Sequence, residues 1–179
     1  MIANPPSRLQ ARAESPEVFY PGTDPVVVDA SDVDRLARTA LASPRKRARL
    51  CTHPTAGDAL HEMIITLPRE AYVRPHKHLG KTESFTVLQG EADLILFNDD
   101  GSVRQVIAMG PLDSAKPFYH RTARPVYHTL IVRSAHLVFH EVTSGPFRRE
   151  QTVFPDWAPD GTDESAAHRF NARFGAVQP

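Results

Sequence analysis

The sequence predicts a single, mainly β domain: an antiparallel sandwich or barrel with one short helix near its N-terminus. Short apolar runs recur from residue 61 to residue 142, and turn residues separate them. Proline is frequent, at 16 of 179 residues, which disfavours long helices. The length suits one domain with a hydrophobic core, and the sequence contains no internal repeat.

The distribution of residue types divides the chain into three segments. Residues 1–24 are rich in Pro, Ser and Arg and are expected to be an N-terminal extension that is mobile or lies over the surface of the domain. Residues 25–162 contain the apolar runs and are expected to form the domain. Residues 163–179 are expected to be a C-terminal tail, in which residues 166–174 can form a short helix.

The beginning of the domain shows the features of an amphipathic helix. Apolar residues at helical spacing predict a helix over residues 32–42, which Pro44 ends. Ser31 is the expected N-cap, with Asp34 at the capping-box position. Before the helix, the β-branched run Val26–Val28 predicts an edge strand.

The following part of the chain has the pattern of β-structure. The segment Asn98–Gly101 is a strong hairpin-turn signal between two of the runs. The strand pattern is lost after Gly145-Pro146. The expected strands are Met63–Leu67, Ser84–Gln89, Ala92–Phe97, Val103–Met109, Tyr127–Val132 and Leu137–Val142.

The charge balance and the cysteine content limit the partners and the location. Lys plus Arg and Asp plus Glu both number 21, so nucleic acid and anionic membrane are not expected as partners. Cys51 is the only cysteine, which fits a reducing compartment. The N-terminus lacks the apolar core of a signal peptide, and no apolar run is long enough to span a bilayer. We therefore expect a cytoplasmic protein.

The segment from residue 74 to residue 90 contains the residues that indicate chemistry. His76 and His78 are two apart, so on a strand their side chains project from the same face. Glu83 follows after a short turn and can face both imidazoles across a hairpin. Two imidazoles and a carboxylate suit one divalent transition metal such as iron, zinc, manganese or nickel, with copper a further choice.

The alternative interpretation is that these polar side chains occupy an exposed turn without a metal. For a bare His-x-His pair that interpretation would be preferred. With Glu83 and Gly90 at their spacings, the pattern HxHx4Ex6G arises by chance in roughly one such chain per thousand. The spacing therefore favours a metal site.

This pattern resembles the metal-binding half of the first cupin motif, which implies a double-stranded β-helix, or jelly-roll, barrel. One departure is Glu70, which stands where the motif has a glycine. The second cupin motif implies one more ligand, and His128 lies at the expected position. That motif is degraded, because Pro125 occupies its glycine position and Ala123 its proline position. The competing histidines are His120 in an expected loop, and His136 and His140 in the following strand.

A narrower resemblance, to the WbuC-type cupin-fold metalloproteins, covers residues 26–162. It implies His76, His78, Glu83 and His128 as the metal ligands, and the family has no agreed reaction. Its members are often associated with surface-polysaccharide gene clusters, which suggests a sugar-related ligand. Phe147 departs from the usual tyrosine. The residues that carry the resemblance are Arg47–His53, Tyr72–His78, Glu83, Val87–Gly90, Phe97–Gly101, Tyr127-His128, Glu141, Gly145–Phe147 and Trp157–Pro159.

Arg47, Arg49 and His53 form a polar group just before the barrel. They are candidates for binding a substrate anion, because arginine offers a forked set of donors. A solvated basic turn is the alternative.

Tyr72, Arg74 and Glu141 are further candidates for substrate binding. Alternation places Tyr72 and Arg74 on the face of His76, and Glu141 can support a ligand histidine. The alternatives are that Arg74 faces solvent at the rim of the barrel and that Glu141 pairs with an arginine on the outside. Cys51 and Trp157 are interpreted as packing residues.

Two hypotheses of function follow, and the catalytic residues stay unknown in both. In the first, the chain is a metalloenzyme, an oxygenase or isomerase for example, acting on a small polar molecule such as a sugar or a carboxylate. In the second, it is a non-catalytic module that binds such a molecule through the metal. A purely structural oligomer would leave the clustered ligands unexplained. Because cupins commonly pair through sheet edges, a homodimer is the expected assembly.

Overall fold

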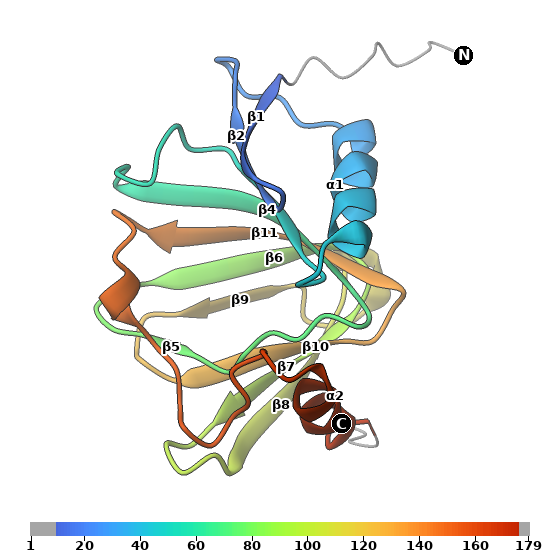
Figure 1. Ribbon diagram of the computed structural model, residues 1–179, viewed down its shortest axis with the longest axis vertical. Coiled ribbons are helices and arrows are strands. Elements are labelled where there is room, and N and C mark those ends of the chain that lie inside the picture. The colour runs from blue at the N-terminus through green and yellow to red at the C-terminus, as the bar shows by residue number, and fades with distance from the viewer. Residues whose placement is uncertain (1–9, 176–179) are drawn as a thin grey trace.

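The computed structural model describes residues 10–175, and over this range the chain forms two facing β-sheets with a helix beside each (Figure 1). The predicted mainly β class is confirmed. The helices are α1 (Ala30–Ala42) and α2 (Glu164–Ala172). In the described part of the chain, neither helix has the length and apolar character that crossing a bilayer requires.

The larger sheet has seven strands. Its neighbours pair antiparallel except β2 and β3, which are parallel. In spatial order the strands are β1 (Ala11–Ser15), β2 (Val18–Pro21), β3 (Ala48–Cys51), β4 (Leu60–Pro68), β11 (His136–Ser144), β6 (Glu83–Gln89) and β9 (Tyr119–Thr122).

The opposing wall has two parts, which a single bridge connects. Strands β10 (Tyr127–Val132), β7 (Ala92–Phe97) and β8 (Val103–Met109) form a three-stranded sheet in that order. A two-stranded piece, β12 (Thr152–Val153) with β5 (Lys77–His78), continues it, because His76 pairs with His128. Short 3-10 helices span Leu112–Ser114 and Arg149–Gln151.

Three of the predicted strands have the predicted bounds: β7, β8 and β10. The turn between β7 and β8 is also confirmed, since the Asn98 N–H donates to the Ser102 carbonyl and Gly101 has a φ of +86°. Trp157 packs beside this turn and against Phe97, in agreement with its predicted role as a packing residue.

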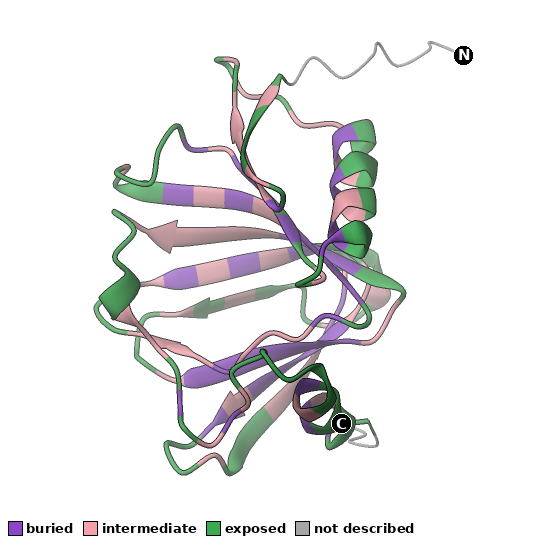
Figure 2. Ribbon diagram, in the orientation of Figure 1, coloured by how far each residue is buried: buried purple, intermediate pink, exposed green. Residues whose placement is uncertain are grey.

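The space between the sheets is closed by apolar side chains at one end. Leu94, Leu137 and their neighbours from both sheets form this core. A second cluster lies on the outer face of β7 and β10, where α2 covers Ile95 and Ile131. Strand β10 is therefore buried along its whole length (Figure 2).

The beginning of α1 differs from the prediction. Asp29, not Ser31, is the N-cap: its carboxylate accepts hydrogen bonds from the N–H groups of Ser31 and Asp32, and Asp32 reciprocates. The expected strand at Val26–Val28 is wrong, because these residues are not paired and Val26 and Val28 pack instead in the cluster beneath α1.

The expected N-terminal extension contains a hairpin. Strands β1 and β2 pair with each other, and β2 joins β3 through Val18 and Phe19. This hairpin was not predicted, because β1 carries mostly polar residues and β2 is only four residues long, so both are held by pairing with other strands. Residues 1–9 of the extension, and residues 176–179 of the tail, lie outside the described residues.

Candidate metal centre

The four predicted ligands come from elements that meet on the inner wall of the barrel. His76 and His78 lie at β5, Glu83 begins β6, and His128 lies in β10. A turn at Gly80, with a φ of +67°, reverses the chain between His78 and Glu83. The larger sheet therefore supplies the carboxylate and the opposing wall supplies the imidazoles.

The donor atoms of these residues form one cluster. One ligand atom from each of His76, His78, Glu83 and His128 lies within 4.8 Å of all the others. Glu83 Oε2 lies 3.0 Å from His78 Nε2, and Glu83 Oε1 lies 3.3 Å from His128 Nε2. Around an ion at about 2.1 Å, ligand atoms are separated by about 3 to 4.2 Å, so a small inward movement of the side chains would bring all four donors to one metal.

The hydrogen bonds on the far side of the rings orient the imidazoles. His76 Nδ1 lies 2.8 Å from the Arg74 carbonyl oxygen, and His128 Nδ1 lies 3.0 Å from that of Val126. A carbonyl only accepts, so both Nδ1 atoms are protonated and donate, which turns the Nε2 atoms toward the cluster, where a metal would bind their lone pairs. Metal-binding histidines in proteins are oriented in this way.

The charges in the cluster also favour a bound cation. Burial lowers the pKa of His76 to about 3, with the nearby His128 adding to the effect, so His76 is neutral at physiological pH. Burial alone would raise the pKa of Glu83, but hydrogen bonds with His128 and His78 outweigh it and hold that pKa below its ordinary range. Burial alone would lower the pKa of His128, but its hydrogen bond with Glu83 and the Glu83 charge outweigh burial and raise that pKa. Without metal, the ionised Glu83 carboxylate therefore holds a proton on His128, and a bound metal would displace that proton.

The cluster opens onto a cavity of about 740 Å³ between the sheets. Apolar side chains such as Leu67, Phe85 and Leu130 line the part next to the core, and polar groups line the rest. A volume of this order holds a small organic molecule.

The competing histidines lie outside the cluster. His120 is in β9 and not in a loop, so the predicted loop was wrong: its ring packs on Phe85, across from it in β6. The polar residues of β9 concealed this edge strand. His136 is exposed, and His140 lies 3.7 Å from Glu62. Of the four, only His128 joins the cluster.

Glu141 lines the cavity from β11 and is not part of the metal cluster. Its side chain forms neither a hydrogen bond nor an ion pair with any described residue. Burial raises the pKa of Glu141 to about 8, and the charge of Glu83 acts in the same direction. Glu141 is therefore largely protonated at neutral pH, and its carboxyl group can donate a proton inside the cavity.

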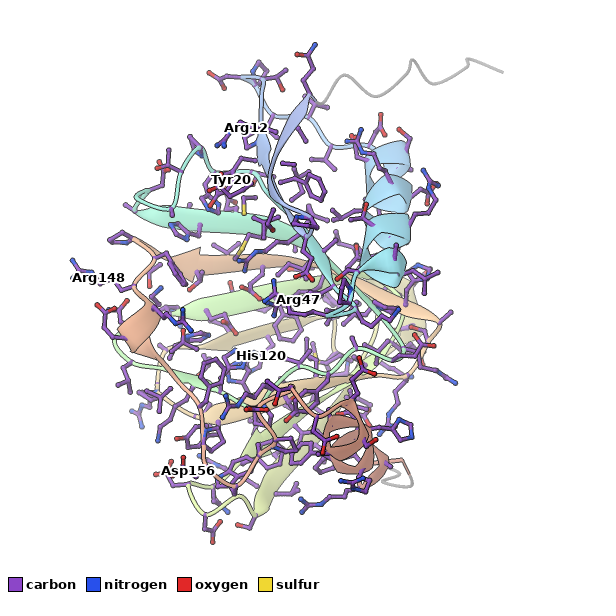
Figure 3. The ribbon with its side chains drawn as sticks, viewed as in Figure 1. Arg12, Tyr20, Arg47, His120, Arg148 and Asp156 are labelled. Carbon is purple, nitrogen blue, oxygen red and sulfur yellow. The ribbon has the colours of Figure 1, made fainter. Side chains whose placement is uncertain are left out.

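The basic group before the barrel also lines the cavity. Arg47 and Arg49 are largely exposed, and Figure 3 labels Arg47 near the strands of the larger sheet. Arg47 interacts with the buried Glu17, so part of its charge is already neutralised. His53 is buried and stacks on His61, with ring centroids 4.1 Å apart.

Tyr72 and Arg74 have different environments, although both line the cavity. The Tyr72 hydroxyl donates to the Pro159 carbonyl oxygen at 2.8 Å, and burial raises its pKa to about 12. The Arg74 guanidinium lies 4.6 Å from the centre of the Phe154 ring. Arg74 Nε is buried and has no hydrogen-bond partner in the described structure.

Sequence reasoning missed three residues of this site. Thr152 Oγ1 lies 3.2 Å from His78 Nδ1, and the Phe154 ring lies 6.1 Å from that of His76. Both belong to the segment after β11, where the sequence has no strand pattern from which its position over the cluster could be predicted. Lys81 lines the cavity from the turn before Glu83. The sequence shows that Lys81 is near the ligands, but not that it is buried.

The two facing sheets, with three histidines and one glutamate on their inner walls, are the arrangement that the sequence motif implies. The fold is cupin-like. A family model matches residues 28–109, less than half of the chain, and describes them only as a domain of unknown function, DUF6016. No match was found among curated proteins.

Several solved structures are partly similar. A protein from Shewanella oneidensis has 6% identity over 72% of this chain and 80% of its own, with a TM-score of 0.49. A sugar phosphate isomerase of the cupin superfamily from Silicibacter pomeroyi has 20% identity over 49% and 52%, with a TM-score of 0.39. An oxalate decarboxylase from Bacillus subtilis has 17% identity over 54% and 24%, with a TM-score of 0.43.

These similarities are partial. The cupin-like chain spans 24% of the decarboxylase chain and 21% of an 11S globulin chain from Brassica napus. The activities in the names of these structures are therefore not assigned to this chain.

Proposed function

We propose that this cupin-like chain is a metal-dependent enzyme that acts on a small polar molecule inside the barrel. The observation that carries the proposal is the cluster of His76, His78, Glu83 and His128 at the wall of a cavity large enough for such a molecule. A site that only stabilised the fold would need no cavity beside it. The resemblance to WbuC-type metalloproteins supports the same ligand set.

The residues of the chain have separable roles in this proposal. His76, His78, Glu83 and His128 hold the metal, which supplies Lewis-acid or redox chemistry when bound. Glu141 is the proposed acid or base, because it lines the cavity outside the cluster and its pKa, about 8, lies near neutral pH. The apolar part of the cavity limits the water around the reacting molecule.

Metal content is the first test. We expect about one equivalent of a divalent transition metal in protein purified without added metal or a histidine tag. His76→Ala and His78→Ala should each lose most of it, because removing one imidazole greatly weakens the site. His136→Ala is the matched control, since His136 is exposed and outside the cluster. Unchanged metal in both site variants would refute the assignment.

Turnover is the second test. Candidate sugars and carboxylates would be screened with the metal-loaded protein, and any activity should disappear in His78→Ala. Glu141→Gln should keep the metal and lose most of the turnover, because the amide cannot transfer the proton. Metal-dependent binding without turnover of any substrate would support the binding-module hypothesis instead.

A further inference from the structure

The turn between the metal-binding histidines and Glu83 has an unusual pattern of burial. Lys81 is only 9% exposed, whereas Leu79, two residues earlier, is 42% exposed. Lysine is almost never fully buried unless it is paired. Lys81 has no ion pair and no hydrogen bond with any described residue. The charges of Glu83 and Glu150 act on the Lys81 ammonium group, but neither carboxylate forms an ion pair with it.

The backbone of the turn holds this arrangement. Gly80 takes a left-handed conformation, with a φ of +67°. The Leu79 N–H donates to the Gln151 carbonyl oxygen at 2.8 Å, and the Thr82 N–H donates to Ser144 Oγ at 3.1 Å. The turn is therefore anchored on both sides of Lys81, which makes its inward direction a property of the fold.

Lys81 lies close enough to the metal cluster for its charge to interact with that of Glu83. Lys81 lines the cavity together with all four residues of the cluster. The Phe147 ring lies 5.5 Å from Lys81 Nζ and shields it on one side. An ammonium group held in this way has three donors available for a molecule in the cavity.

Arg74 is a second cation with the same character. It lies two residues before His76, as Lys81 lies two residues before Glu83, and it too lines the cavity. Its guanidinium group has no hydrogen bond within the described structure and lies against the Phe154 ring. With a divalent metal bound, the positive charge around the cluster exceeds the negative charge that Glu83 supplies.

We propose that the molecule bound in this cavity carries an oxyanion, a carboxylate or a phosphate, and that Lys81 binds it beside the metal, with Arg74 as a second contact. An oxyanion would supply the missing acceptors for these buried donors and balance the excess positive charge. The inference rests on the proposed function for its use of the metal. It adds a substrate class and assigns Lys81 to its recognition.

The experiment measures anion affinity in protein loaded with Co²⁺, whose visible spectrum changes when its surroundings change. Malonate, inorganic phosphate and neutral glucose would be titrated, with calorimetry as a second readout. We expect wild-type protein to bind malonate, phosphate or both. Lys81→Met should weaken that binding about tenfold or more, because a charge-assisted hydrogen bond is lost. Lys81→Arg should stay within about threefold of wild type, because it keeps a charged donor.

Lys116→Met is the matched control, since Lys116 pairs with Glu91 at 2.7 Å outside the cavity. It should not change anion affinity. Lys81→Met should melt at the same or a higher temperature than wild type, because the buried cation without a partner is gone, so loss of fold is excluded directly. Metal content measured beforehand separates this inference from the proposed function.

Binding of malonate alone would assign a carboxylate, and binding of phosphate alone a phosphate. Equal anion affinity in wild type and Lys81→Met, at full metal content, would overturn the inference and leave the metal assignment intact. The inference would also be overturned if the metal-loaded wild type bound neither anion. Failure of the chain to take up metal would instead refute the proposed function on its own.

Discussion

Glu141, Lys81 and Arg74 share a feature at the scale of single residues: their side chains line the cavity without a hydrogen bond in the described structure. Most buried polar groups in proteins have a partner, and leaving one without a partner costs stability. Three such groups line one cavity beside four candidate metal ligands, which indicates that they are available to bind a molecule there.

The raised pKa of Glu141 predicts how stability depends on pH in the metal-free protein. Its pKa is about 8 in the fold and has an ordinary value of 4.5, so the fold favours the protonated form. This contribution is fully present below pH 4.5 and is lost as pH rises toward 8. Chemical denaturation should show a loss on the order of 2 kcal/mol between pH 5 and pH 8 that is absent in Glu141→Gln.

The comparison between the two proteins isolates this residue, because every other titrating group is present in both. Bound metal should reduce the difference, since a nearby cation lowers the pKa of a carboxyl group. Parallel pH profiles of wild type and Glu141→Gln in the metal-free state would contradict the prediction.

At the scale of elements, the β7–β8 hairpin depends on its turn glycine. Gly101 has a φ of +86°, and a Cβ atom there would lie 2.8 Å from Trp157 Cδ2. Gly101→Ala should therefore lower the free energy of unfolding by about 1–3 kcal/mol. Gly57→Ala is the control, because the nearest atom to a new Cβ is Thr55 Oγ1 at 3.5 Å. Equal stability of the two variants would argue against this packing.

The N-terminus of α1 allows a direct test between two capping residues. Asp29→Ala should lower the free energy of unfolding by about 1 kcal/mol, since its carboxylate accepts from Ser31 N and Asp32 N. Asp34→Ala, at the capping position that the sequence predicts, should have a much smaller effect. Thermal denaturation of both variants decides between them, and a larger effect of Asp34→Ala would favour the capping box expected from the sequence.

The sequence predicted the elements whose signal is local. Short apolar runs and the Asn98–Gly101 turn located β7 and β8, and the spacing of His76, His78 and Glu83 located the cluster. Strand β9 was missed because its residues are polar and its pairing with β6 is a tertiary contact. The burial of Lys81 could not be read from the sequence, since it depends on where the turn meets the segment after β11.

At the scale of the whole molecule, the metal cluster joins the two walls of the barrel. Glu83 belongs to the larger sheet, and His128 belongs to the opposing one. A metal held by both acts as a cross-link that the unfolded chain cannot form to the same extent. The opposite end of the barrel is held by the apolar core.

Bound metal should therefore raise the melting temperature. At a free metal concentration of 100 times Kd, the expected stabilisation is about 2.7 kcal/mol. His128→Ala should abolish this gain, and its metal-free stability, which also falls because Glu83 loses a partner, is measured separately. Differential scanning calorimetry with and without metal measures both quantities. An equal gain in His128→Ala would place the metal elsewhere.

The junction of the two walls through Glu83 and His128 has a consequence for the lifetime of the protein in a cell. Proteases cut chains that open, and the fraction of open chains rises as the cross-link is lost. When metal is scarce, newly made copies would open more often and be degraded sooner. The steady-state amount of this protein would then follow the supply of its metal, without any change in the rate of its synthesis.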